Sequence, residues 1–271
     1  MVPILTLLIG AVGWRYTWGV MGGVMLLIML PLVTLLVRNR PEDVGLLPDG
    51  AQAKESAEPW ARGVERGVPA EAVWTMQQAL RTRTFWLLIG AVNLEQLVAG
   101  AMIYHQVPFL TAEGMSYRSA TFVLSAFLGI IALSRIPWGF VLDRVPMRYA
   151  MAFLFLNKSL GVLSLVVVPY PYSVGTYLIL SGLIGGPDGL VTPLSFANYF
   201  GRTFAGSIQG AVRLFLSPTQ LVGPLLFAIV FDATGTYHYL FIVASGLGIF
   251  SAVLALMARP PQHRSQPLGA G

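Results

Sequence analysis

Long apolar segments, separated by short polar ones, dominate this sequence. Seven of them are nearly free of charge: Tyr16–Val37, Thr84–Tyr104, Ala120–Leu142, Tyr149–Val168, Val174–Ala197, Phe204–Val230 and Tyr237–Met257. An α-helix needs about 20 apolar residues to cross a bilayer. The pattern therefore predicts seven membrane-spanning helices.

The remaining segments are of three kinds. Met1–Val12 is apolar but short, has no basic start or small-residue cleavage site of a signal peptide, and is followed by a predicted turn at Gly13-Trp14-Arg15. Between the first two spans lies a polar connector, in which Pro69–Thr82 predicts a short amphipathic helix. The tail after Arg259 is rich in Pro and Gln and is expected to be disordered.

Composition supports a membrane protein. Hydrophobic residues make up 55% of the chain and charged residues only 11%, whereas a soluble domain has about 25% charged residues. The fold class that this predicts is all-α, a polytopic helical membrane protein. The chain has no cysteine, which excludes disulfides and thiolate metal sites.

The net charge of +5 is explained better by membrane orientation than by binding to nucleic acid. If the connector is cytoplasmic, 12 Lys and Arg lie on that side, and only Arg15 and Arg118 lie on the other. Cytoplasmic loops are enriched in Lys and Arg. We therefore expect the lipid bilayer and no nucleic acid as partner, a cytoplasmic C-terminus, and location in a bacterial cytoplasmic (inner) membrane.

A charged stretch follows the third predicted span. Gly139 and Asp143 are four residues apart and share one helix face, and Arg144 and Arg148 lie in the turn beyond. Gly139 leaves room for a neighbouring helix to approach closely. The stretch resembles the glycine-aspartate-arginine-arginine loop signature of the major facilitator superfamily, which implies a gating role for these four residues. The alternative is a positively charged cytoplasmic loop without such a role.

The resemblance extends over nearly the whole chain. Segments similar to the oxalate/formate-antiporter-like and monocarboxylate branches occur in order at Gly13-Trp14-Arg15, Pro41–Gly50, Ala79–Trp86, Asn198–Gly201, Gly223-Pro224 and Asp232–Tyr237. The resemblance implies the C-terminal half of a twelve-helix transporter, helices 6–12. Its implied parts are a remnant of the N-terminal bundle (1–37, the end of helix 5 and helix 6), a cytoplasmic central loop (38–83), a six-helix bundle (84–258) and a cytoplasmic tail (259–271).

Such transporters pair two halves around a site at the bilayer midplane. The first four helices and most of the fifth have no counterpart here. We therefore expect an incomplete chain, whose partner is the missing N-terminal half of the full-length protein; the alternative is that a separate chain supplies that half.

Charged residues inside a span cost about 2.5–3.5 kcal/mol each on insertion scales, so each needs a reason. Arg135 lies roughly 10 Å and Arg213 roughly 13 Å from a span end, at about 1.5 Å per residue. Both can bind a carboxylate bidentately, and the resemblance implies basic residues on these two helices as anion ligands. The alternatives are an Arg135–Asp143 pair and an Arg213 that extends to the cytoplasmic surface.

The other charges inside spans suggest proton coupling. Burial favours the neutral form of a carboxyl group, which coupling to a proton gradient requires, and this makes Glu95 a candidate. Asp188 follows Gly185-Gly186-Pro187, residues that can interrupt a helix at a transporter site. The alternatives are a salt bridge between Glu95 and an arginine, and a packing kink at Asp188. For Lys158 we expect a structural ion pair.

Tyr104 and His105 are expected at the outer end of their helix, where they can line a substrate entrance; an anchoring role for Tyr104 in the aromatic belt is the alternative. The histidines show no metal-ligand spacing, and the sequence contains no P-loop, dinucleotide fingerprint or nucleophile elbow. We therefore expect no cofactor, no metal and no enzyme activity.

The function that these features predict is secondary active transport of a small organic anion, by proton symport or by antiport. Drug efflux is one alternative, which a cavity dominated by aromatic and acidic residues would favour. The other is a non-transporting membrane receptor or partner subunit, which a large soluble output domain would favour.

Overall fold

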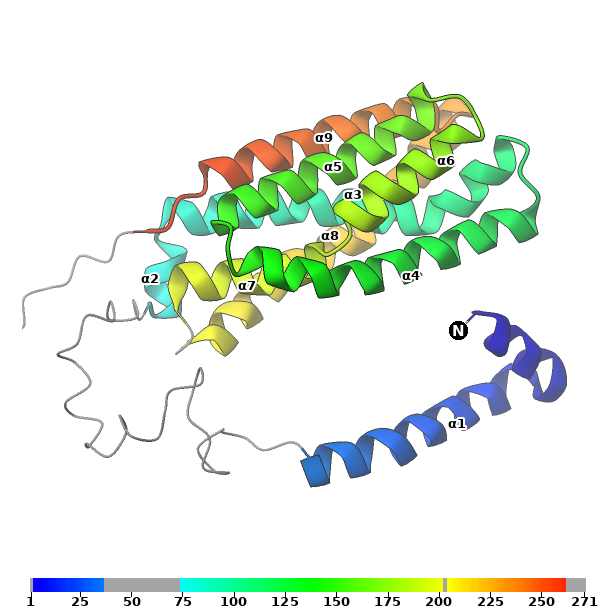
Figure 1. Cartoon of the computed structure of the whole chain (residues 1–271), viewed down its shortest axis with the longest axis horizontal. Helices are drawn as coiled ribbons and strands as arrows, with labels where there is room; N and C mark the ends of the chain where they lie inside the picture. Colours follow the sequence, from blue (N-terminus) through cyan, green and yellow to red (C-terminus); the bar gives the residue numbers. More distant parts are fainter. Residues whose placement is uncertain (1, 37–73, 202–203, 262–271) are drawn as a thin grey trace, which may run out of the picture. The chain divides into compact units, whose positions relative to one another are not determined.

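The computed structural model describes residues 2–36, 74–201 and 204–261 of the chain. Internal contacts divide the chain into two compact units, residues 1–70 and 71–271 (Figure 1). Most of the predicted central loop and most of the predicted tail lie outside the described residues.

The first unit contains one long helix, α1 (Val2–Leu36), shown in blue in Figure 1. Gly13 interrupts it with a φ of 76°, a left-handed conformation that glycine adopts without steric cost. The Thr17 hydroxyl donates to the Gly13 carbonyl at 2.8 Å, one helical turn back along the chain. The turn predicted at Gly13 is thus confirmed, and the helix beyond it is apolar on all sides, which is typical of a membrane span.

The second unit is a bundle of helices. Its elements are α2 (Met76–Leu80), α3 (Arg83–Ala112), α4 (Tyr117–Leu142), α5 (Met147–Val167), α6 (Tyr172–Tyr177), the π-helical segment η4 (Leu178–Ile184), α7 (Asp188–Phe200), α8 (Ala205–Thr234) and α9 (His238–Met257). With α6, η4 and α7 counted as one span and α1 added, seven segments of the described chain are long and apolar enough to cross a membrane. The predicted all-α, polytopic fold is confirmed.

Helix α3 is longer than the sequence indicated. Its start is capped by the Thr82 hydroxyl, which accepts from the Phe85 amide at 3.2 Å. The predicted end near Tyr104 is wrong, because the helix continues to Ala112 and the turn lies at residues 113–116. Gln106, a polar residue just beyond that predicted end, is fully buried, and its side chain accepts a hydrogen bond from Tyr177 at 3.2 Å.

The short helix α2 is capped by Thr75, whose hydroxyl accepts from the Gln78 amide while the Gln78 side chain accepts from the Thr75 amide. This reciprocal arrangement satisfies two amides that a helix start leaves free. The helix covers five residues of the predicted segment Pro69–Thr82. The beginning of that segment, up to residue 73, lies outside the described residues.

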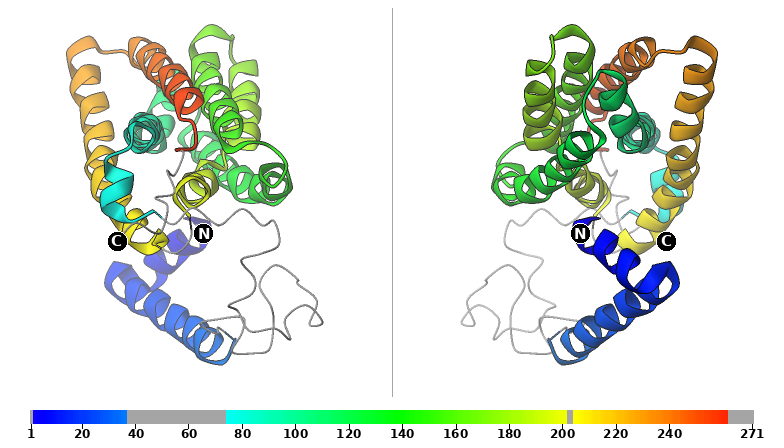
Figure 2. Two further views of the ribbon diagram at one scale, coloured as in Figure 1. Left: turned by 90° about the vertical axis from the view of Figure 1, so that its left-hand side faces the viewer. Right: turned by 90° about the vertical axis from the view of Figure 1, so that its right-hand side faces the viewer.

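Packing within the bundle is uneven. Helix α5 packs mainly against α9, and α3 packs against α8 and α9. In contrast, α4 and α8 are the least buried spans of the bundle, and Figure 2 shows them on opposite flanks of it. The two flanking helices therefore leave much of their surface uncovered by the rest of the bundle.

The fifth membrane-length span of the chain, which lies in this bundle, is broken between η4 and α7, at Gly185–Pro187. A Cβ atom on Gly185 would lie 2.6 Å from the Lys158 Cβ of α5, and one on Gly186 would lie 2.1 Å from the Gly182 carbonyl oxygen. Neither position has room for a side chain, and Pro187 has no amide to donate. The helix break that the Gly-Gly-Pro sequence indicated is present.

Candidate functional site: a buried ion cluster and two arginines inside spans

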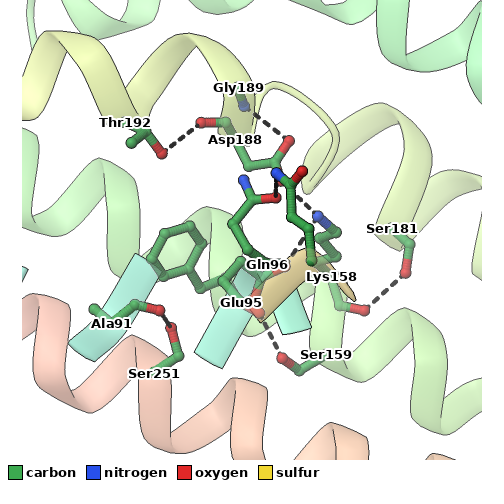
Figure 3. Close-up of polar contacts among 12 residues, drawn as sticks. Ala91, Glu95, Gln96, Lys158, Ser159, Ser181, Asp188, Gly189, Thr192 and Ser251 are labelled. Atoms are coloured by element: carbon green, nitrogen blue, oxygen red, sulfur yellow. Dashed lines mark hydrogen bonds and ion pairs between the residues drawn. The ribbon is translucent and has the colours of Figure 1, made fainter. Parts of the chain in front are cut away.

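Three charged side chains from three helices meet inside the bundle (Figure 3). The Lys158 Nζ of α5 lies 2.9 Å from the Glu95 Oε1 of α3 and 2.7 Å from the Asp188 Oδ2 of α7. The exposed fractions of these side chains are 8%, 1% and 16% respectively. Lys158, Glu95 and Asp188 are called the Lys158 cluster below. With all three groups ionised its net charge is −1 (+1 − 2).

The helix break positions Lys158. The Ser181 hydroxyl of η4 donates to the Lys158 carbonyl at 2.7 Å, and Gly185 lies against the Lys158 backbone. On the other side, a Cβ atom on Gly248 of α9 would lie 2.0 Å from the Ser159 Oγ and 3.7 Å from the Glu95 Oε2. Glycines at positions 185 and 248 thus allow η4 and α9 to approach α5 closely enough to enclose the cluster.

The two carboxylates have different surroundings. Asp188 is the first residue of α7, where the free amides of a helix start favour an acidic group. Its Oδ1 accepts from the Gly189 amide at 2.8 Å, and its Oδ2 is the atom paired with Lys158. Glu95 has only the Lys158 contact at Oε1, and its buried Oε2 has no hydrogen-bond donor among the described residues.

These contacts show the ion-pair partners of Lys158 and Glu95, for both of which the sequence led to an expectation. Lys158 forms the structural ion pairs expected of it. A salt bridge between Glu95 and an arginine, considered as an alternative, is not what the structure contains, because the partner is a lysine. Glu95 and Asp188, which the sequence suggested separately, share that lysine.

Arg135 lies beside the start of α7. A Cβ atom on Gly189 would lie 3.4 Å from its Nη2, so the guanidinium group is next to the residue that follows Asp188. The side chain is exposed in this unit. Among the described residues Arg135 forms no ion pair, so the alternative of a pair with Asp143 is not observed.

Arg213 lies on α8 in a row of polar residues. The Gln209 side chain donates to the Pro193 carbonyl of α7 at 3.1 Å, and the Gln220 side chain donates to Gln96 of α3 at 3.3 Å. Arg213 lies between these two positions, four residues after the first and seven before the second, on the same side of the helix. Its side chain is exposed and, within the described ranges, has no ion-pair partner.

Tyr104 and His105 do not lie at a helix end. The Pro224 carbonyl can only accept, so His105 Nε2 carries the ring proton and donates to it at 3.1 Å, while Nδ1 accepts from the Tyr237 hydroxyl at 3.4 Å. His105 therefore joins α3 to α8. Tyr104 is 68% exposed.

The predicted gating residues surround the turn between α4 and α5. Arg144 donates to the Phe140 carbonyl at 2.8 Å, and the Arg148 guanidinium stacks on Tyr149 and donates to its hydroxyl at 2.7 Å. Asp143 is not ion-paired with an arginine in the described part of the chain. Gly139 has no described neighbour within 4 Å of its Cβ position, so no helix of this bundle packs there.

Beside this turn is a cleft of about 470 Å³. It lies where α5 begins and where α7 and α9 end, and its lining residues are Val145, Pro146, Met147, Arg148, Asn198, Tyr199, Arg259 and Pro260. The Tyr199 hydroxyl donates to the Ala258 carbonyl at 3.0 Å and joins two of these ends.

Polar contacts that the sequence analysis missed connect α3 to its neighbours. Asn93 of α3 is hydrogen-bonded to Thr219 of α8, and Gln96 bonds Gln220 one turn further along. The sequence feature that could have indicated these contacts is an amide side chain inside an apolar span, because burying an amide is costly unless it is hydrogen-bonded. As for metals, no group of three or more His, Asp or Glu residues suited to an ion occurs in the ranges that the structure describes.

Membrane-length helices around a charged interior define a polytopic membrane protein of the kind to which secondary transporters belong. Residues 1–217 match the family model described as Major Facilitator Superfamily. The chain belongs to this family, and the resemblance found in the sequence is confirmed.

Individual relatives are more distant. The chain is 24% identical to monocarboxylate transporter 12 of Mus musculus, over 93% of this chain and 54% of the relative. It is 23% identical to the hexuronate transporter of Bacillus subtilis (strain 168), over 54% of this chain and 36% of the relative. The chain thus spans about half the length of the mouse relative, and the match covers 36% of the Bacillus subtilis relative. Both relatives are transporters by name.

Proposed function

We propose that the complete protein is a secondary transporter of a small organic anion with a carboxylate group, working by alternating access. The observation that carries this proposal is Arg135, a guanidinium group inside a membrane span that has no anionic partner among the described residues. A cation in that position is costly unless a counter-ion accompanies it. A carboxylate substrate supplies one.

The chemistry of the guanidinium group suits this substrate class. Its planar fork donates two parallel hydrogen bonds to a carboxylate, which a lysine ammonium does not reproduce. Arg213 adds, on α8, a second cation without an ion-pair partner in the part of the chain that the structure describes. The names of the relatives, a monocarboxylate transporter and a hexuronate transporter, each refer to a substrate with a carboxylate group.

The weakly buried helices α4 and α8 carry these two arginines. Transporters of this kind hold substrate between two six-helix halves. We propose that α4 and α8 face the N-terminal half in the full-length protein, with Tyr104 and His105 towards one entrance. Gly139, Asp143, Arg144 and Arg148 would brace one conformation and release it during transport.

Proton coupling is the second part of the proposal. Glu95 and Asp188 are carboxylates in an apolar bundle, close to the start of α7 where Arg135 also lies. A carboxylate that alternates between charged and neutral forms can couple anion movement to a proton gradient. The distribution of Lys and Arg supports a cytoplasmic C-terminus, and we propose the bacterial cytoplasmic membrane as the location.

Uptake by the full-length protein in proteoliposomes tests the proposal. Labelled mono- and dicarboxylates are supplied with and without an imposed proton gradient, for wild type, Arg135→Gln, Arg213→Gln and the control Arg118→Gln, which changes an exposed arginine at the first turn of α4. We expect uptake by wild type and the control, and a loss of about tenfold or more in each of the other two variants. Unchanged uptake in both would refute the anion site.

A further inference from the structure

We propose that Glu95 binds the coupling proton at Oε2, that Lys158 remains paired with Asp188 in both protonation states, and that this one proton sets the anion affinity of the Arg135 site. The inference rests on the proposed function and goes beyond it, because it separates the roles of the two carboxylates and gives Lys158 a positioning role.

The hydrogen bonds of the two carboxylates indicate which one is protonated. Both oxygens of Asp188 already have donors, the Gly189 amide at 2.8 Å and Lys158 Nζ at 2.7 Å. A proton on either oxygen would displace one of them. Glu95 Oε2 is buried and has no donor among the described residues, so a proton that binds there displaces no hydrogen-bond donor. The proton enters from water on one side and returns to water on the other.

No other charged group in the described bundle is paired with Glu95. Helix α5 contributes Lys158 and α7 contributes Asp188. Helix α9 contributes the backbone at Gly248 and contains no Asp, Glu, Lys or Arg. The charged residues of α8 are Arg213 and Asp232, and Arg135 of α4 is the charged group beside Gly189.

The charge of the cluster changes by one when Glu95 is protonated. Its net charge is −1 with both carboxylates ionised and zero with Glu95 neutral. A negative cluster near Arg135 repels an incoming carboxylate, and a neutral cluster does not. Proton binding and anion binding therefore favour each other, and this coupling is reciprocal: the anion also increases the affinity for the proton.

Lys158 holds Asp188 in position at the start of α7. Ser181 bonds the Lys158 carbonyl, and Gly185 fits against its Cα and Cβ. When the Glu95 contact weakens on protonation, the 2.7 Å contact to Asp188 remains. Lys158 thus keeps the helix break in one geometry while the charge of the cluster changes.

The test is anion binding to the purified full-length protein at pH 6 and pH 8. The probes are lactate, pyruvate and glucuronate, carboxylates that stay ionised across this range. For wild type we expect the Kd to rise about tenfold from pH 6 to pH 8. Glu95→Gln, which imitates the protonated form, should bind tightly at both pH values, with less than about a twofold change. Glu113→Gln is the matched control, because Glu113 is exposed and its ionic contact, to His238, is at 3.9 Å.

A second measurement uses wild type alone, in case Glu95→Gln does not fold. Anion binding at pH 8 in weakly buffered solution, followed with a pH-sensitive dye, should take up about one proton per bound anion. No proton uptake, a pH-independent wild-type Kd, or a Glu95→Gln protein that keeps the tenfold pH effect would overturn the inference. If the anion still requires Arg135 in those cases, the proposed function stands; if none of the probes binds to wild type, both fail.

Discussion

The Lys158 cluster and the two arginines Arg135 and Arg213 show two ways in which charges are held in a membrane protein. In the cluster, a buried lysine contacts two carboxylates within 3 Å, and three helices are joined. The two arginines lie on the weakly buried helices α4 and α8 and have no ion-pair partner among the described residues. The first arrangement satisfies its cation inside the bundle, whereas the second leaves two cations to be satisfied by something else, such as a substrate or the opposing half.

The largest effect expected from this contrast is that of Lys158→Met. Removing the cation leaves two carboxylates unpaired in the interior, and breaking a buried ion pair in this way costs about 3–5 kcal/mol. We expect a protein that is poorly expressed or melts much earlier than wild type in a detergent thermal-shift assay.

Lys158→Arg, which keeps the charge, is the control for that variant and should lose less stability. A Lys158→Met protein with the melting temperature of wild type would show that the cluster contributes little to folding.

Substitution of the two arginines should have a different effect: anion binding is lost and stability is kept. In Arg135→Lys the charge remains but the bidentate geometry is lost, so we expect anion affinity to fall about tenfold, with a melting temperature close to that of wild type. Binding and thermal-shift assays on the same preparation measure both. Equal affinities of the Lys and Arg forms would mean that Arg135 acts only as a point charge.

A smaller effect is expected where α5 meets the helix break. In Gly185→Ala the new Cβ would lie 2.6 Å from Lys158 Cβ and 2.8 Å from its Cα, so the backbones must separate. Overpacking of this kind costs about 1–3 kcal/mol. The control Gly175→Ala changes a helical glycine with no described neighbour within 4 Å, and it should be neutral or slightly stabilising. Equal melting temperatures for the two variants would contradict the close packing.

The smallest effect is expected at His105, which joins α3 to α8 and belongs neither to the Lys158 cluster nor to the two arginines. His105→Leu removes two hydrogen bonds, to the Pro224 carbonyl and to the Tyr237 hydroxyl, and should cost about 1 kcal/mol. If His105 also lines a substrate entrance, anion affinity will change as well. The comparison variant is Tyr104→Phe, which removes an exposed hydroxyl and should not lower stability. It separates a structural role of His105 from a role of this region in substrate entry.

The sequence was sufficient to find the charged residues but not to pair them. Glu95, Lys158 and Asp188 each lie in an otherwise apolar span, where a charge is recognisable by its cost. That Lys158 lies between the other two depends on how α5 packs against η4 and α9, through Gly185 and Gly248. Those contacts join segments distant along the chain, and periodicity carries no information about them.

Helix boundaries show the same limit. The break at Gly185–Pro187 was visible in the sequence because Gly and Pro act locally. The end predicted near Tyr104 was wrong because Gln106 is polar and yet buried, where its side-chain carbonyl accepts a hydrogen bond from Tyr177. A polar residue marks the end of a span only if no hydrogen-bond partner is available inside the bundle. For Gln106 that partner comes from another helix, which the local sequence does not reveal.

The interruption of the fifth span has a mechanical consequence. The segments before and after Gly185–Pro187 are separate helical segments, and Asp188 lies in the later one, α7. Lys158 belongs to α5, which is uninterrupted. Its ion pair with Asp188 therefore links a continuous helix to the second half of an interrupted span. If α7 moves away from α5 by bending at Gly185–Pro187, the Lys158 side chain must extend to keep its ion pair with Asp188. The length of one lysine side chain thus limits how far the span can bend with this ion pair intact.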